Sequence, residues 1–365
     1  MGNNAPHILV AGGGTGGHLF PALAIADEIK KLRPDAEFLF IGNKGKIEAR
    51  VVPQRGHTFR TIWISGFHRR LTIDNLLFPL KVLVSLVQSF FVIRQFRPDV
   101  ALGTGGYVCG PVLFVASTLK VPIVLHEANS YPGITTRMLA SRATKIFIAF
   151  DDVKRWLKRT DRVTISGTPT REILGTVSPS VSREFFQLDP NKKTLLVFGG
   201  SLGATSVNNA VLETLDDLLH GGIQLIWQTG QTDFERVRSA IGTMSVGWVG
   251  VFIDRMEFAF AASDLVVCRG GATTLAELTR VGKPAIIIPY PHAAGDHQLH
   301  NARSLADAGA AVMIVDQDAR QTLSSVALGL LRDPERLENM GRTSALLGKP
   351  EAGRLIATEI LEMVR

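Results

Sequence analysis

The segment His7–Ile29 carries the first pattern that could do chemistry: a short apolar run, a turn paved with glycines, and then a histidine. It reads HILVAGGGTGGHLFPALAIADEI, and Gly12, Gly14 and Gly17 match the G-x-G-x-x-G fingerprint of dinucleotide-binding sites. Such a turn aims backbone N–H groups at an anion such as pyrophosphate. A tight strand-to-helix turn without a ligand explains the same glycines.

The hydride-transfer reading of this fingerprint lacks its second element. A dinucleotide-binding enzyme carries an acidic residue at the end of its second strand, where it holds the ribose. Here the predicted strand 37–42 is followed by Asn43, Lys44 and Gly45, and Glu48 already lies in the next segment. A nicotinamide-dependent enzyme is therefore disfavoured.

Residues 268–290, CRGGATTLAELTRVGKPAIIIPY, are the most informative segment. A buried strand ends at Cys268, two glycines turn the chain, and a helix is predicted over Ala272–Val281 with Gly282 as its C-terminal cap. The start of that helix suits a diphosphate, and Glu277 could hold two ribose hydroxyls.

A capping box is the competing interpretation, because Thr274-x-x-Glu277 has its spacing. The turn GGSLGA (199–204) favours the ligand role, since it adds a second glycine-rich turn in the same half of the chain. Ser201 there is a further donor to phosphate.

The 365 residues suggest two domains, and their net charge of +7 favours anionic partners. Nucleic acid is disfavoured, because the basic residues are scattered and lack interleaved aromatics. Two cysteines without a CxxC motif indicate a reducing compartment, and no secretory signal is expected at the N-terminus.

Short apolar strands alternate with helical segments through both halves of the chain, which predicts two doubly wound α/β domains. A polar connector around 170–192 separates them. Ligands of such sheets gather beyond the carboxyl ends of the strands, so a cleft between two facing domains is the expected site. The predicted strands are 8–11, 37–42, 100–106, 122–129, 145–150 and 163–169, and then TLLVFGG, IQLIWQTG, VGVFID, DLVVCRGG, PAIIIPY and AAVMIV.

Residues 76–93 are nearly continuously apolar, long enough to raise the question of a membrane span. Pro79, Lys81 and Gln88 argue against it, and a buried crossover helix is the expectation for most of the segment. Basic residues flank it and would suit anionic lipid headgroups. They are His68, Arg69, Arg70, Arg94 and Arg97.

Taken together, the motifs resemble the MurG family of glycosyltransferases, within glycosyltransferase family 28. They run in order from residue 12 to residue 302, so the resemblance covers nearly the whole chain. The motifs are GGGTGGH (12–18), GTGGYVCGP (103–111), HEAN (126–129), GTPTR (167–171), GGSLGA (199–204), FID (252–254), RGGATTLAE (269–277) and DHQLHNA (296–302).

The resemblance implies a GT-B fold of two Rossmann-like domains. Residues 1–169 would bind the acceptor and the membrane, 170–345 would bind UDP-GlcNAc, and 346–365 would pack back on the first domain. The implied reaction moves N-acetylglucosamine from UDP-GlcNAc to lipid I (undecaprenyl-diphospho-MurNAc-pentapeptide), giving lipid II for peptidoglycan synthesis. The implied setting is the cytoplasmic side of the cell membrane, peripherally, with cell-wall synthesis proteins as possible partners and roles in cell shape and division.

The same resemblance carries site residues over by matching position. Residues of the first domain border the donor sugar and diphosphate, and those of the second hold the nucleotide, the ribose and the GlcNAc hydroxyls. They are Thr15, Gly16, Gly17 and Asn129, and then Arg171, Ser201, Ile253, Ala272, Thr273, Thr274, Leu275, Ala276, Glu277 and Gln298. This chain departs from the family at Ala128, Thr168 and Thr170, where glutamine, asparagine and valine are usual.

The implied chemistry is an inverting displacement at the anomeric carbon by the C4 hydroxyl of MurNAc. Helix N-termini stabilise the leaving UDP, with Arg269 or Arg171 adding positive charge. His18 is the first candidate for the base that the hydroxyl needs, and Glu127 is its rival. A histidine that only buttresses the turn is equally compatible with the sequence.

Neither a cofactor nor a metal is expected. Residues 292–300 hold three histidines and an aspartate, but without a familiar zinc spacing. Three other functions stay open from sequence: a related UDP-sugar transferase acting on another lipid, a UDP-GlcNAc 2-epimerase on a similar fold, and a nucleotide-sugar binding module without turnover.

Overall fold

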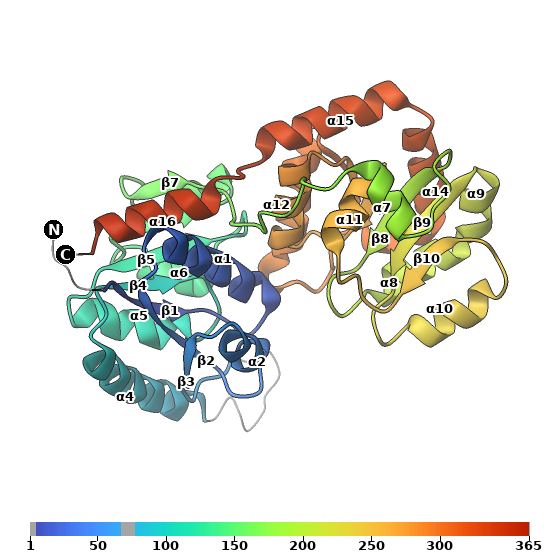
Figure 1. Cartoon of the computed structure of the whole chain (residues 1–365). Coiled ribbons are helices and arrows are strands. Elements are labelled where there is room, and N and C mark those ends of the chain that lie inside the picture. Colours follow the sequence, from blue (N-terminus) through green and yellow to red (C-terminus); the bar gives the residue numbers. More distant parts are fainter. Residues whose placement is uncertain (1–4, 67–76, 365) are drawn as a thin grey trace. The chain divides into compact units, whose positions relative to one another are not determined.

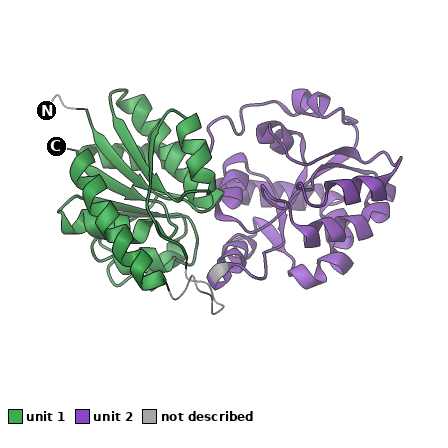
Figure 2. Ribbon diagram, turned by 90° about the horizontal axis from the view of Figure 1, so that it is seen from below, with its two compact units in different colours: residues 1–170, 350–365 green, residues 171–349 purple. Residues whose placement is uncertain are grey.

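A computed structural model describes residues 5–66 and 77–364 and divides the chain into two compact units (Figure 2). Unit 1 comprises Met1–Thr170 and Pro350–Arg365, and unit 2 comprises Arg171–Lys349. The sequence-based boundaries were 169 and 345. Residues 346–349 fall with unit 2 because its last helix continues to Leu347 and the backbone at Gly348 lies tight against Thr279.

Unit 1 is a seven-stranded parallel sheet in the order β3-β2-β1-β4-β5-β6-β7 (Figure 1). The order reverses between β1 and β4, which is the topological switch point of such a sheet. Its elements are β1 His7–Ala11, α1 Gly16–Leu32, β2 Glu37–Gly42, α2 Ile47–Gln54, β3 Thr58–Thr61, α4 Phe78–Phe96, β4 Val100–Gly103, α5 Cys109–Thr118, β5 Ile123–Glu127, α6 Ile134–Leu139, β6 Lys145–Ile148, η1 Asp151–Trp156, β7 Val163–Ile165 and α16 Ala352–Glu362.

Unit 2 is a six-stranded parallel sheet in the order β10-β9-β8-β11-β12-β13, with its switch point between β8 and β11. Its elements are α7 Pro179–Phe185, β8 Lys193–Phe198, α8 Thr205–Glu213, α9 Leu215–His220, β9 Ile223–Gln228, α10 Phe234–Ile241, β10 Gly247–Gly250, α11 Met256–Ala262, β11 Leu265–Cys268, α12 Ala272–Val281, β12 Ala285–Ile287, η2 Ala294–Asp296, α13 His297–Asp307, β13 Ala311–Met313, η3 Asp316–Asp318, α14 Ala319–Leu331 and α15 Pro334–Leu347.

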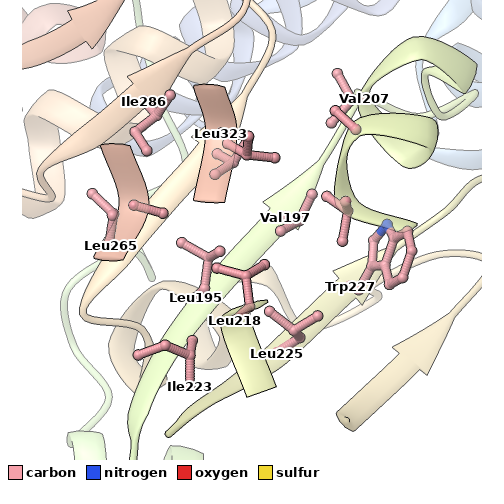
Figure 3. Packing of buried hydrophobic residues seen from close by; sticks show 14 of the residues in the cluster. Leu195, Val197, Val207, Leu218, Ile223, Leu225, Trp227, Leu265, Ile286 and Leu323 are labelled. Atoms are coloured by element: carbon pink, nitrogen blue, oxygen red, sulfur yellow. The ribbon is translucent and has the colours of Figure 1, made fainter. Parts of the chain in front are cut away.

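The core of unit 2 shows why the apolar strand pattern predicts the sheet. Alternate residues of β8 and β9 point to one face, where Leu195, Val197 and Leu225 pack with Leu323 of α14 (Figure 3). Trp227 is fully buried beside them, and its indole N–H donates to Asn208 Oδ1 at 3.0 Å. Burial on both faces explains why these strands read as continuous apolar runs.

The C-terminal helix α16 belongs to unit 1 although its sequence follows unit 2. It lies along α1, and Ile356, Ala357 and Ile360 join the core cluster of β1 and α1. Lys145 Nζ of β6 and Glu359 Oε2 of α16 form an ion pair at 2.6 Å. The return of this segment to the first domain is what the family resemblance implies.

Helix α4 is not the mostly buried crossover helix that its apolar sequence suggested. It connects β3 to β4 and packs against α5, but its fully buried side chains are Lys81, Ser85, Ser89 and Ile93. Lys81 Nζ donates to Ser65 Oγ at 3.0 Å, and Ser89 Oγ donates to the Ser85 carbonyl at 2.7 Å. Three polar residues of this helix therefore face the protein beside Ile93, which belongs to the core, and Val82, Leu86, Val92 and Phe96 pack partly buried against that core.

The outward face of α4 carries large apolar side chains, which we call the apolar stripe. Its members recur at helical spacing: Leu80, Leu83, Val87, Phe90 and Phe91. Leu83 and Phe91 are 60% and 66% exposed. Within residues 5–66 and 77–364, α4 is the one helix with the length and composition of a membrane span, and 22% of that window is buried. Its flanking residues 68–70 lie outside the described residues.

Candidate active site

The glycine turn after β1 is shaped by close approach to two side chains. A Cβ on Gly12 would lie 2.1 Å from Thr104 Oγ1, and one on Gly13 would lie 2.5 Å from the carboxyl carbon of Glu48. Gly14 has a φ of 83°, in the left-handed region that favours glycine. The turn thus sits at the switch point of unit 1, beside the loop that follows β4.

Thr15, Gly16, Gly17 and His18 share the start of helix α1 on this turn. Thr15 is the N-cap residue and makes no side-chain cap bond, so the first N–H groups of α1 are not capped by its hydroxyl. The resemblance assigns Thr15 to Gly17 to the donor sugar and diphosphate, and that assignment stays a prediction. Their place at the carboxyl edge of the sheet suits a polar ligand.

The Nδ1 atom of the His18 ring contacts the glycine turn. Its Nδ1 lies 3.1 Å from the carbonyl oxygen of Gly13 and 3.4 Å from Thr15 Oγ1. A carbonyl oxygen only accepts, so in the neutral ring Nδ1 carries the proton and Nε2 carries the lone pair. The buttress and the base are therefore compatible roles, because anchoring Nδ1 produces the tautomer that a base requires.

The rival base, Glu127, has its carboxylate fully engaged. Oε1 accepts from the N–H and Nδ2 of Asn129 at 3.1 and 3.2 Å, and Oε2 accepts from Gly133 N–H at 3.0 Å and Thr136 Oγ1 at 2.7 Å. The side chain is buried. This geometry makes Glu127 the residue that shapes the loop 128–136 and orients Asn129, the predicted sugar contact.

His126, next to Glu127, is buried and faces β7. Its Nε2 lies 3.1 Å from the carbonyl oxygen of Gly167. Burial lowers its pKa, which the hydrogen bond to Gly167 and the charge of Glu127 oppose. The imidazole is therefore neutral at physiological pH. Ala128, where the family has glutamine, is buried and leaves these contacts intact.

In unit 2, helix α12 begins where the sequence predicts, after the turn that ends β11. Gly271 is its N-cap residue and Gly282, at φ 63°, is its C-cap. The N–H groups of Ala272, Thr273 and Thr274 belong to the first turn, which lacks partners within a helix. Thr273 Oγ1 is buried and has no hydrogen-bond partner among the described residues.

The capping-box alternative for Glu277 is wrong. Thr274 lies three residues inside α12, and the Glu277 carboxylate contacts Arg171: Oε1 is 3.0 Å from Nε and 2.8 Å from Nη2. Burial raises the pKa of Glu277, and the Arg171 charge opposes that rise. A buried carboxylate with a half-exposed counter-ion is the arrangement expected at a polar binding site.

The sequence-based assignment also includes Leu275 and Ala276, which differ in exposure. The Leu275 side chain is 1% exposed and packs in the core, and its N–H donates to the Gly271 carbonyl at 3.0 Å. Leu275 therefore has neither side chain nor N–H to offer a ligand. Ala276 is partly exposed, so a ligand contact at that position stays a prediction.

Three further predicted contacts lie at the same edge of the sheet, two on loops and one in the first turn of a helix. Ser201 is exposed on the turn after β8. Ile253 follows β10, which ends at Gly250 instead of continuing through 254 as predicted, and its N–H donates to Gln228 Oε1 at 2.8 Å. Gln298 near the start of α13 accepts from Tyr290 N–H at 3.0 Å through Oε1.

Gln228 is a site residue that the sequence reading missed. Its Nε2 donates to the Gly200 carbonyl at 2.8 Å while its Oε1 holds Ile253. One buried amide thus fixes both the turn after β8 and the loop after β10. The available signal was a polar residue closing an apolar strand.

Arg269 does not supply the free positive charge considered from sequence. It is 8% exposed, and its guanidinium contacts Asp316 and donates to Ser206 Oγ at 2.6 Å and the Ile288 carbonyl at 3.0 Å. Its charge is neutralised inside unit 2. Arg171, 48% exposed, is the remaining candidate.

The described residues hold no group of three or more His, Cys, Asp or Glu side chains that could bind a metal ion.

Two family models match successive parts of the chain. The glycosyltransferase family 28 N-terminal domain matches residues 8–148, and the glycosyltransferase family 28 C-terminal domain matches residues 194–356. The two matches fall on the sheets of units 1 and 2. The chain therefore belongs to glycosyltransferase family 28, and its two parallel-sheet domains are those of the GT-B fold.

Individual relatives narrow this to the MurG enzymes. The UDP-N-acetylglucosamine–N-acetylmuramyl-(pentapeptide) pyrophosphoryl-undecaprenol N-acetylglucosamine transferase of Salinibacter ruber is 42% identical over 100% of this chain and 98% of that protein. The crystal structure of Acinetobacter baumannii MurG matches with a TM-score of 0.79 and 26% identity, covering 98% of this chain and 99% of that one.

The alternative of an epimerase finds support only at the level of fold. The UDP-GlcNAc 2-epimerase of Neisseria meningitidis, solved with UDP-GlcNAc bound, matches with a TM-score of 0.66 and 12% identity over 98% of this chain and 100% of that one.

Proposed function

We propose that this chain transfers N-acetylglucosamine from UDP-GlcNAc to the C4 hydroxyl of the MurNAc residue of lipid I, with inversion at the anomeric carbon. The observation that carries the proposal is the edge of unit 2, where an uncapped helix start and a buried, Arg-paired Glu277 lie together. That pair of features suits a diphosphate next to a ribose. The names of full-length relatives supply the donor, the acceptor and the bond formed.

In unit 2 the N–H groups of Ala272, Thr273 and Thr274 would receive the diphosphate, with Ser201 as a further donor. Glu277 would accept from the ribose hydroxyls, and Arg171 would balance the charges. The backbone at Ile253 would meet the uracil, and the amide of Gln298 would reach the GlcNAc hydroxyls. Gln228 holds two of these loops in place.

In the chemical step the C4 oxygen of MurNAc bonds to the anomeric carbon while the bond from that carbon to the diphosphate breaks. His18 Nε2 takes the hydroxyl proton, and UDP leaves with the electron pair. The helix start and Arg171 stabilise the charge that develops on UDP. A neutral imidazole suits this role near pH 7.

Single-turnover kinetics with UDP-GlcNAc and lipid I test the base assignment. His18→Ala is expected to slow the chemical step about 10²- to 10⁴-fold with unchanged UDP-GlcNAc affinity. Glu127→Gln is expected to slow the chemical step less, because it only loosens the loop that carries Asn129. His220→Ala, at an exposed histidine of α9, is the control. Near-normal chemistry in His18→Ala, with weakened UDP-GlcNAc binding, would refute the assignment.

The substrate assignment is tested with the same assay by exchanging one partner at a time. Turnover is expected with UDP-GlcNAc and lipid I, and not with UDP-galactose or with diacylglycerol as acceptor. Turnover of diacylglycerol would indicate a transferase for another lipid, and nucleotide-sugar binding without turnover would indicate a binding module.

The apolar stripe of α4 supports association with the membrane that carries such an acceptor. The apolar side chains of the stripe stay exposed, although Ile93 and several other apolar residues of the same helix pack against the core. Arg94 and Arg97 are exposed at its end. Each basic residue near an anionic surface adds about 1 kcal/mol of binding energy. A peripheral place on the cytoplasmic face, next to other cell-wall synthesis proteins, completes the proposal.

Flotation with anionic vesicles at low salt tests this part separately. The unaltered chain is expected to float with phosphatidylglycerol vesicles. The double variant Leu83→Glu and Phe91→Glu is expected to remain in the bottom fraction, which holds protein that is not bound to vesicles. Leu346→Glu, on a 78% exposed leucine of α15, is the matched control. Equal flotation of the unaltered chain and both variants, or no flotation of the unaltered chain, would contradict membrane association through the apolar stripe.

A further inference from the structure

One peptide group in the glycine turn is held on both sides. The N–H of Gly14 donates to Oε2 of Glu48 at 2.9 Å, and the carbonyl oxygen of Gly13 accepts from His18 Nδ1 at 3.1 Å. These N–H and C=O groups belong to the same planar amide. A carboxylate, a peptide and an imidazole therefore form one chain of hydrogen bonds.

Glu48 is built into the fold for this contact. It comes from the first turn of α2 and has no exposed surface. Its second oxygen accepts from Asn43 N–H at 3.0 Å. Added Cβ atoms on Gly13 and Gly42 would each lie 2.5 Å from its side chain. The carboxylate thus occupies a cradle that only glycines leave open, and it links the ends of β1 and β2.

The electronic consequence follows from the amide. A negative charge that accepts from the N–H draws electron density through the conjugated peptide toward its oxygen, and consecutive hydrogen bonds strengthen one another in this way. The Gly13 oxygen becomes a better acceptor for the Nδ1 proton. Nε2 then becomes more basic, and the imidazolium that forms when it takes a proton is stabilised.

We infer that Glu48 is a positioning residue for His18, acting through the Gly13–Gly14 peptide to fix the tautomer of the imidazole and raise its basicity. The inference rests on the proposed function, in which His18 Nε2 removes the proton of the acceptor hydroxyl. No proton crosses the peptide. The arrangement explains why the turn has glycine at position 13.

The other titratable groups near His18, among the described residues, do not replace this charge. From β5, His126 is neutral because burial lowers its pKa, and Glu127 is occupied by four donors of its own loop. From α5, burial raises the pKa of the Cys109 thiol to about 12, so it is uncharged. Glu48 of α2 is the carboxylate hydrogen-bonded into the turn itself.

The test is Glu48→Gln in the full chain, read by NMR and by kinetics. Two backbone N–H groups need two acceptors, and an amide offers one. With histidine side chains labelled and His18 assigned through His18→Gln, the His18 pKa is expected to fall by roughly half a unit, within the ~1-unit spread of histidines in proteins. The acidic limb of the single-turnover rate should move to lower pH, and the plateau should drop about tenfold.

The donor residues of unit 2 are untouched by this variant. Asp99→Asn is the control, since Asp99 accepts from the His7 N–H at 2.8 Å at the opposite end of β1. It should leave the His18 pKa and the pH profile as they are. A second measurement needs no variant: the Gly14 amide proton of the unaltered chain should titrate with the His18 pKa.

The outcomes separate the inference from the function on which it rests. If His18→Gln keeps full single-turnover chemistry, the base assignment fails, and the His18 pKa in Glu48→Gln still tests the relay. If His18 is required but its pKa in Glu48→Gln equals that of the unaltered chain, the relay is overturned, because a purely structural role would lower the rate without moving the pKa. A Gly14 amide proton that ignores His18 titration overturns it too.

Discussion

Replacing Arg171 by alanine is expected to destabilise unit 2, and more so at alkaline than at acidic pH. The guanidinium is the counter-ion of Glu277, whose side chain is 11% exposed against 48% for Arg171. Removing one partner costs about 3–5 kcal/mol in a fully buried pair and about 0–1 kcal/mol at the surface. Because Arg171 is half exposed, we expect a loss of about 1–2 kcal/mol.

The sign of the pH dependence follows from burial. Burial raises the pKa of Glu277 in the folded chain. As pH rises from the unfolded pKa to the folded one, the unfolded chain gives up its proton first, and stability falls across that window. Without the Arg171 charge the folded pKa rises further, so the window widens upward. The loss relative to the unaltered chain is therefore largest above it.

Thermal unfolding at about pH 5.5 and about pH 8 measures the effect. A loss of 1–2 kcal/mol corresponds to a fall of roughly 2–8 °C for a unit of this size, mostly at the higher pH. Arg171→Lys keeps the charge and should lose less. Adding Glu277→Gln to Arg171→Ala should restore most of the stability while abolishing tight UDP-GlcNAc binding. Equal losses at both pH values, or no restoration, would refute the reasoning.

Three further predictions concern the turn, the thiols and the core. Gly13→Ala should lose activity and stability, because its Cβ meets the Glu48 carboxyl group at 2.5 Å. Gly110→Ala, with open space around it, is the control and should be neutral or stabilise the chain by about 0.4–1 kcal/mol. Activity and melting temperature are measured for both variants. Cys109 and Cys268 should resist iodoacetamide in the folded chain, as burial raises the pKa of both to about 12, and react on unfolding, which mass spectrometry detects; fast labelling of the native chain would contradict this. Asn208→Ala should lower the free energy of unfolding in urea by about 2–4 kcal/mol, because the Trp227 N–H and the Thr229 carbonyl lose their partner. Asn209→Ala is the control, and an equal loss there would contradict the role of these two hydrogen bonds.

Much of the fold follows from local patterns. The apolar runs and the glycine turns predict most of the parallel strands, the α12 helix with its Gly282 cap, and the two-domain organisation. Strand β3 was missed, since three of its four residues TFRT are polar and exposed. Strand β10 was predicted to begin and end further along the chain than it does, because none of its four residues is fully buried and the apolar pattern therefore does not mark its ends.

The roles of individual side chains could be predicted from the sequence only in part. Residue types and their order determined by themselves that the chain is a two-domain glycosyltransferase with a helix start and an acid at the second switch point. Tertiary structure alone decided that α4 leaves an apolar stripe exposed, that Arg269 is neutralised by Asp316, that Glu127 serves its loop, and that Glu48 reaches the glycine turn. The physical reason is that periodicity and turn chemistry act over a few residues, whereas a buried charge takes whichever partner the folded chain brings within hydrogen-bonding distance.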